Sequence, residues 1–133
     1  MLTHMPLSRA ARTLALALTC LVCSLALTAC VPTFPTEPPG ITGHVVSVVA
    51  GDGRPASMNV ESSGTPAPGA VSDKALVNIP PNTMFFDAQG FQASPQLVAS
   101  IAPATVVRVW FTGPVAESYP VQGSAKAVQI LGK

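Results

Sequence analysis

Cysteine thiols are the side chains of this sequence with the most distinctive placement, since all three lie at or before position 30. Cys20 and Cys23 have the C-x-x-C spacing of redox and metal sites, but they stand inside an apolar stretch, residues 14–27. Cys30 differs because small residues precede it, in Leu27-Thr28-Ala29-Cys30. This placement at the end of the apolar stretch distinguishes Cys30 from the other two cysteines.

The N-terminal residues have the order of a secretory signal peptide. Arg9 and Arg12 make a basic start without acids, the apolar stretch follows, and small residues precede Cys30. The stretch of about fourteen residues is short for a bilayer crossing, which needs about twenty. We therefore expect residues 1–29 to be cleaved, with Cys20 and Cys23, and a retained transmembrane helix is the alternative.

The four residues ending at Cys30 resemble the lipobox of bacterial lipoproteins. The resemblance implies a thioether-linked diacylglycerol on Cys30, cleavage before it, and usually a third acyl chain such as palmitate on the new amino group. Each buried methylene contributes about 0.8 kcal/mol, so two or three chains form a stable anchor. We expect an extracytoplasmic protein anchored in the cell membrane, or in the outer membrane of a cell with two, where Val31 rather than Asp fits the sorting pattern.

The distribution of charge in the mature chain argues against nucleic acids as partners. From Cys30 onward, five basic and six acidic residues are scattered singly, whereas nucleic-acid binding requires clustered Lys and Arg. Once Cys30 is lipidated, no thiol remains for a disulfide. About ninety residues suffice for one core without such staples, and we expect a single domain that is a monomer.

Proline dominates residues 30–40, which contain Pro32, Pro35, Pro38 and Pro39. Such density favours polyproline II at about 3.1 Å per residue, so we expect a semi-rigid tether that holds the domain roughly 30 Å above the membrane. A Pro-rich recognition motif is the alternative, but basic flanks are missing.

Residues 41–133 carry a β pattern. Apolar runs bounded by Gly and Pro predict strands at 41–50, 56–61, 74–79, 105–112 and 124–131, with a short apolar piece at 84–86. Ser94-Pro95 predicts the start of a helix of about two turns, which ends before Pro103 and turns Leu97 and Ile101 to the core. The order predicts an all-β domain with one short helix, a five-stranded Greek-key barrel of the oligonucleotide/oligosaccharide-binding (OB) type. A β-sandwich fragment is the alternative.

A second resemblance rests on Val109 to Pro120 (VWFTGPVAESYP) followed by Gln122 to Lys126. This run looks like the C-terminal signature of the YobA-like family of small bacterial lipoproteins, and Gly43-His44-Val45 and Asp73 to Val77 fit it loosely. The resemblance implies a lipid-anchored small β-domain of unknown function, without an activity.

Residues 113–120 have two interpretations. As a site, the loop brings together Glu117, Ser118 and Tyr119, which could hold a small polar ligand or the backbone of a partner, beside Arg108 and Trp110 on the outer face of the preceding strand. As structure, Gly113-Pro114 turns the chain and Tyr119-Pro120 is prone to a cis bond. An exposed Arg108–Glu117 pair would contribute roughly 0 to 1 kcal/mol.

Catalytic and metal-binding sets are missing from the mature sequence. His44 is its only histidine, so a Ser-His-Asp triad or a zinc site lacks members. Gly51-Asp52-Gly53 superficially resembles a calcium loop but lacks ligands at alternate positions, which favours a hairpin turn. We expect no enzyme activity, no catalytic residue, no metal and no cofactor.

These observations predict a non-catalytic binding or interaction module that contacts an envelope protein or a small polar ligand. A structural or accessory envelope protein without a specific ligand is the alternative, and a small hydrolase or ligand-transfer protein is the third.

Overall fold

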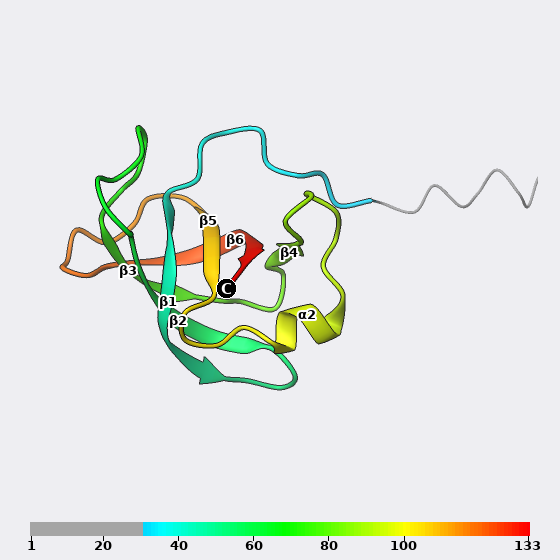
Figure 1. Ribbon diagram of the computed structural model, residues 1–133. Coiled ribbons are helices and arrows are strands. Elements are labelled where there is room, and N and C mark those ends of the chain that lie inside the picture. The colour runs from blue at the N-terminus through cyan, green and yellow to red at the C-terminus, as the bar shows by residue number, and fades with distance from the viewer. Residues whose placement is uncertain (1–30) are drawn as a thin grey trace, which may run out of the picture. The chain divides into compact units, whose positions relative to one another are not determined.

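Six strands and one short helix follow the Pro-rich segment in the computed structural model, which describes residues 31–133 (Figure 1). In chain order they are β1 (Ile41–Ala50), β2 (Pro55–Glu61), β3 (Lys74–Asn78), β4 (Met84–Phe86), α2 (Pro95–Ala99), β5 (Val106–Phe111) and β6 (Val121–Gly132). Each predicted element is present within a few residues of its expected bounds. No helix in this part of the chain is long and apolar enough to cross a membrane.

Strand pairing closes the sheet into a barrel. The strands are ordered β3-β2-β1-β5-β6-β4, and β3 also pairs with β6 in parallel, so five strands form a closed ring. β4 pairs in parallel with a later part of β6, outside that ring. The helix lies in the connection between β3 and β5, as in the OB-type Greek key, and the predicted fold is confirmed.

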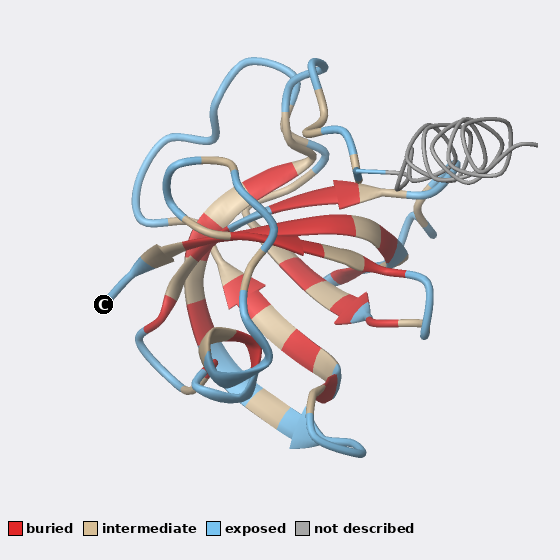
Figure 2. Ribbon diagram, turned by 90° about the vertical axis from the view of Figure 1, so that its right-hand side faces the viewer, coloured by how far each residue is buried: buried red, intermediate tan, exposed pale blue. Residues whose placement is uncertain are grey.

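Alternating apolar residues of the barrel strands fill its interior. The fully buried side chains of this core include Ile41, Val45, Met58, Val60, Val77, Val107, Val109 and Val128. The buried positions recur along the strands in Figure 2, as expected when one face of each strand points inward. Burial of aliphatic side chains, at about 25 cal/mol per Å² of apolar surface, is therefore the main force that holds the ring closed.

The helix is shorter than predicted. Ser94 caps it as expected, with its Oγ accepting a hydrogen bond from Leu97 N at 3.2 Å, and Pro95 occupies the first turn. Ile101 is buried just beyond the helix and Leu97 packs half-buried against the core, while Val98 supplies the buried side chain within the helix itself. One turn covers this end of the barrel because Pro103 follows so closely.

A second apolar cluster lies outside the barrel interior. Phe86, Trp110 and Ala127 are buried there, and Phe34 and Met84 pack against them. The Phe34 ring meets Phe86 and Trp110 edge to face, with centroids 5.2 Å and 5.4 Å away. The Pro-rich segment is thus fastened to the barrel from Phe34 onward. The expectation that it is a semi-rigid tether holding the domain roughly 30 Å above the membrane is wrong for residues 34–40, because they lie on the barrel. The prolines alone predict an extended chain, but the Phe34 ring that lies among them packs against the barrel.

Gly43 lets β1 bend sharply enough to pair with both β2 and β5. A Cβ at this position would lie 2.1 Å from the carbonyl oxygen of Glu61 and 2.5 Å from its carbon, both backbone atoms. β1 runs against β5 at residues 41–44 and against β2 from His44 onward. The close approach therefore occurs where the strand passes from one partner to the other, and only glycine fits it.

Gly43→Ala should destabilise the domain by roughly 2 kcal/mol or more, because the opposing atoms are backbone and cannot turn aside. Urea unfolding followed by circular dichroism measures this change. Val46→Ala, at an exposed position of the same strand, is the control and should change the unfolding free energy by under about 1 kcal/mol. Equal stability of the Gly43 variant and the parent would contradict the described path of β1.

Candidate functional site

Trp110 lies on the outer face of β5, as the sequence predicts, but it is buried there. Its side chain is 3% exposed, because Phe34 and Phe86 cover that face of β5. The indole Nε1 donates a hydrogen bond to the backbone oxygen of Glu37 at 2.8 Å. Trp110 thus fixes the Pro-rich segment on the outer face of the barrel.

Arg108 does not pair with Glu117. Its Nη1 donates to Oε1 of Gln129, its neighbour across β5 and β6, at 3.3 Å. Within residues 31–133 the ion pairs are Lys74–Glu61 and Lys126–Glu37. The predicted Arg108–Glu117 pair is wrong because Arg108 is held in the middle of the strand, while Glu117 lies in the loop beyond its end.

Ser118 and Tyr119 hold the loop between β5 and β6 in shape. Ser118 Oγ donates to the backbone oxygen of Pro120 at 2.8 Å, and the Tyr119–Pro120 bond is cis, as the sequence suggests. The Tyr119 hydroxyl donates to Oδ2 of Asp73, at 3.1 Å, across to the loop before β3. Both polar groups thus have structural partners, whereas Glu117 joins neither ion pair found among residues 31–133.

The environment of the Tyr119 hydroxyl raises its pKa above the ordinary value of 10.0. Partial removal from water is the largest cause, followed by the hydrogen bond to Asp73 and the negative charge of that carboxylate. The nearby Lys74 also has a raised pKa, chiefly because its ammonium donates to Glu61. The phenol therefore stays protonated, and able to donate to Asp73, to a higher pH than an ordinary tyrosine does.

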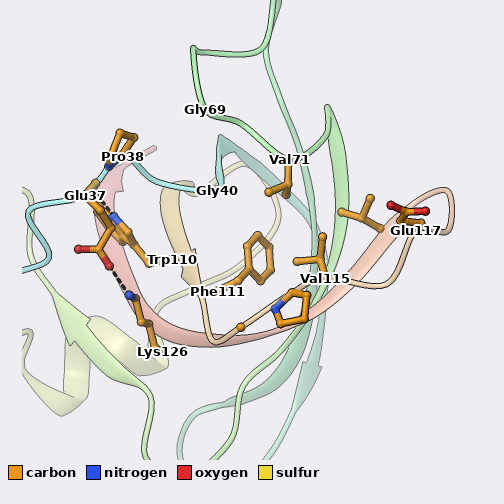
Figure 3. Close-up of a pocket in the computed structure, with 13 residues that line it drawn as sticks. Glu37, Pro38, Gly40, Gly69, Val71, Trp110, Phe111, Val115, Glu117 and Lys126 are labelled. Carbon is orange, nitrogen blue, oxygen red and sulfur yellow. Dashed lines mark hydrogen bonds and ion pairs between the residues drawn. The ribbon is translucent and has the colours of Figure 1, made fainter.

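A groove of about 560 Å³ lies between three segments that are far apart in the sequence. The Pro-rich segment forms one wall, the loop before β3 a second, and the loop after β5 a third (Figure 3). Its lining residues include Pro38, Gly40, Val71, Phe111, Pro114, Val115, Glu117, Val121 and Lys126. Its volume is within the range of about 300–1,000 Å³ that is typical of ligand sites.

Small residues make room for the aromatic floor of this groove. A Cβ at Gly40 would lie 2.5 Å from Phe111 Cδ2, and one at Gly123 would lie 2.7 Å from Phe111 Cδ1 and 2.8 Å from Val115 Cγ1. The Phe111 ring is thus held between two glycines, with Val115 beside it (Figure 3). Larger side chains at positions 40 and 123 would push the ring into the groove.

Two of the charged side chains that line the groove form an ion pair with each other, and the third joins no ion pair among residues 31–133. The Lys126 ammonium donates to the Glu37 carboxylate (Figure 3), and this hydrogen bond is the main reason why the pKa of Glu37 is below its ordinary value. Glu117 joins neither ion pair found in residues 31–133. The site therefore combines a mainly apolar floor with one carboxylate that a basic ligand group can reach.

His44 lies outside this groove. Its Nδ1 is 2.9 Å from Ser63 Oγ, which gives the imidazole the polar partner expected of a histidine in a strand. Among residues 31–133 no three His, Cys, Asp or Glu side chains gather as a metal site. Gly51-Asp52-Gly53 forms the turn between β1 and β2, where Gly51 N donates to Arg54 O at 2.9 Å, so the predicted hairpin is confirmed.

Sequence reasoning missed most of the groove. Val71, Phe111 and Lys126 come from separate segments, and no spacing in the sequence brings them together. Two features of the sequence relate to the groove. One is Phe34, the aromatic residue among the prolines, and the other is the pair of glycines at positions 40 and 123, which leave room for the Phe111 ring. Cys30, the predicted lipidation site, lies outside the described residues.

Asp73→Asn should lower the pKa of Tyr119 part of the way to its ordinary value, because the variant removes the negative charge that opposes ionisation. Tyr119 is the only tyrosine, so ultraviolet absorbance of the phenolate against pH reports on this group alone. Glu117→Gln, in the same loop, is the control and should leave the titration midpoint unchanged. An unchanged midpoint in Asp73→Asn would show that the Tyr119–Asp73 contact does not form.

A family model described as a protein of unknown function, DUF3221, matches residues 71–132. The matched residues run from the loop before β3 to the end of β6. They include two of the three walls of the groove, the loop before β3 with Val71 and the β5–β6 loop, and also Lys126. No curated protein and no solved structure gives a significant match. The matching family carries no assigned activity, so the chemistry of the groove has to indicate the function.

Proposed function

We propose that this chain is an extracytoplasmic lipoprotein, anchored in the membrane through Cys30, whose barrel is a non-catalytic binding module. The signal-peptide pattern and the lipobox support the anchor. The resemblance to YobA-like lipoproteins supports the same placement, and the family match to a domain of unknown function covers the segment on which that resemblance depends.

The groove is the binding site in this proposal, and its lining carries the argument. Phe111, Val71 and Val115 offer apolar surface, and Glu117 offers a carboxylate without a cationic partner among residues 31–133. The groove is open to solvent rather than an enclosed cavity. Such a site suits an extended peptide segment of an envelope protein that carries an apolar side chain next to a basic one.

Lipidation can be tested on the product made by bacterial cells. Mass spectrometry of the N-terminal peptide should find diacylglycerol on Cys30 and no residues 1–29. Cys30→Ala should retain the leader, since cleavage follows lipidation in the lipoproteins that this sequence resembles. Cys23→Ala is the control and should yield the normal mature product. An unmodified Cys30 thiol on a processed chain would overturn the anchor.

Peptide binding can be tested with a photo-crosslinking amino acid at Val71, an exposed position of the groove. We expect an adduct with an envelope protein, joined at a segment with adjacent apolar and basic residues. Glu117→Lys should reduce adduct formation about tenfold, equivalent to about 1.4 kcal/mol of binding free energy.

Asp52→Lys makes the same change of charge in the β1–β2 turn, outside the groove, and should leave the adduct unchanged. An equal loss of adduct in Glu117→Lys and Asp52→Lys would show that the partner is attracted by general electrostatics rather than bound in the groove. The absence of any adduct would favour the accessory role, in which the domain has no specific ligand.

A further inference from the structure

The chain between the proposed anchor and the folded domain is very short. Phe34 is packed against Phe86 and Trp110, and Gly40 N donates to Val109 O at 2.8 Å. Only residues 31–33 separate Cys30 from Phe34. The four Cα–Cα steps from Cys30 to Phe34 span at most about 14 Å. Because the headgroup layer on one side of a bilayer is itself about 6 Å thick, this chain leaves little distance between the proposed anchor and the fold.

An exposed aromatic ring lies beside the point where the chain enters the fold. Gly90 is so close to Phe34 that a Cβ on it would lie 3.5 Å from Phe34 Cδ2. Phe91, the next residue, is 72% exposed. A Phe side chain presented to solvent next to a membrane anchor is within reach of the lipid.

The turn that carries Phe91 is firmly held. Asp87 Oδ1 accepts hydrogen bonds from the backbone N–H groups of Gln89 and Phe91, each at 2.9 Å. Asp87 N donates to Phe91 O at 2.8 Å, and Phe86 pairs with Gln92 as an isolated bridge. The ring is thus presented by a fixed turn, so little conformational freedom is lost when a surface covers it.

We propose that the surface formed by Phe34 and the turn 87–91 docks on the lipid bilayer itself, with Phe91 inserted at the headgroup level. This inference rests on the proposed anchor at Cys30, and it adds that the barrel lies on the membrane in one orientation. Aromatic side chains favour this interfacial depth. The short chain keeps Phe91 at high local concentration near the lipid, so a single ring suffices for docking.

The charge of this surface indicates that docking does not need anionic lipid. Lys126 lines the hollow beside Phe34, but its ammonium is paired with Glu37. Without a free basic cluster, attraction to a negative membrane surface is weak. We therefore expect similar docking on neutral and on anionic vesicles.

Phe91→Trp provides a direct test, because the only native tryptophan, Trp110, is buried. The mature chain, residues 30–133, is coupled through its Cys30 thiol to a maleimide lipid in phosphatidylcholine vesicles with brominated acyl chains. Bromine quenches indoles that reach the bilayer. We expect the added fluorescence of Phe91→Trp to fall about twofold relative to unbrominated vesicles.

Val49→Trp is the matched control, since Val49 is 60% exposed but lies near the β1–β2 turn, away from the Pro-rich segment (Figure 1). Its fluorescence should not change with bromination. Insertion of about a dozen Gly/Ser residues between Val31 and Pro32 should reduce quenching at position 91, because a longer tether lowers the local concentration.

Absence of quenching at position 91, or equal quenching at positions 49 and 91, would overturn the docking proposal. Quenching that requires phosphatidylglycerol in the vesicles would overturn the claim of a charge-independent surface. Chemical coupling supplies the anchor in every sample, so these results do not depend on native lipidation. Failure of the anchor in cells would instead appear as the unmodified Cys30 thiol described above.

Discussion

The packing of Phe34 against Trp110 and Phe86 is the contact on which the other features of this molecule depend. It converts residues 34–40 from an extended chain into part of the domain, and the hydrogen bond from Trp110 Nε1 to Glu37 O fixes their path. The same contact builds one wall of the groove and determines how far the fold can stand from Cys30. A buried indole N–H needs an acceptor, and the backbone of the Pro-rich segment supplies it.

The relation between sequence and structure differs between the barrel and the groove. Alternation along β5 identifies Val107 and Val109 as inward residues, and the Ser94-Pro95 pair identifies the helix start, because these signals are local. The same alternation places Trp110 on the outer face of β5, where it lies. Alternation does not reveal that this face is covered, because the covering segment, around Glu37, is more than seventy residues away in the chain.

The loop between β5 and β6 combines structural and functional features. Ser118 and Tyr119 bond to Pro120 and Asp73 and thereby hold the loop, and Val115 contributes to the groove beside Gly123. In our proposal this leaves Glu117 to meet the ligand from a rigid support. A carboxylate beside an apolar floor favours specificity, because a partner that lacks a basic group leaves the carboxylate unpaired.

The last strand has a consequence for how the domain forms. β6 pairs with β3, β4 and β5. Until this twelve-residue strand is in place, β4 has no strand neighbour, and β3 and β5 are each paired on one side alone, with β2 and β1. Most of these pairings join segments distant in the sequence, which slows closure of a β-barrel relative to local structures. A polypeptide that lacks β6 must therefore remain an open sheet, and the barrel closes only when this strand joins β3 to β5.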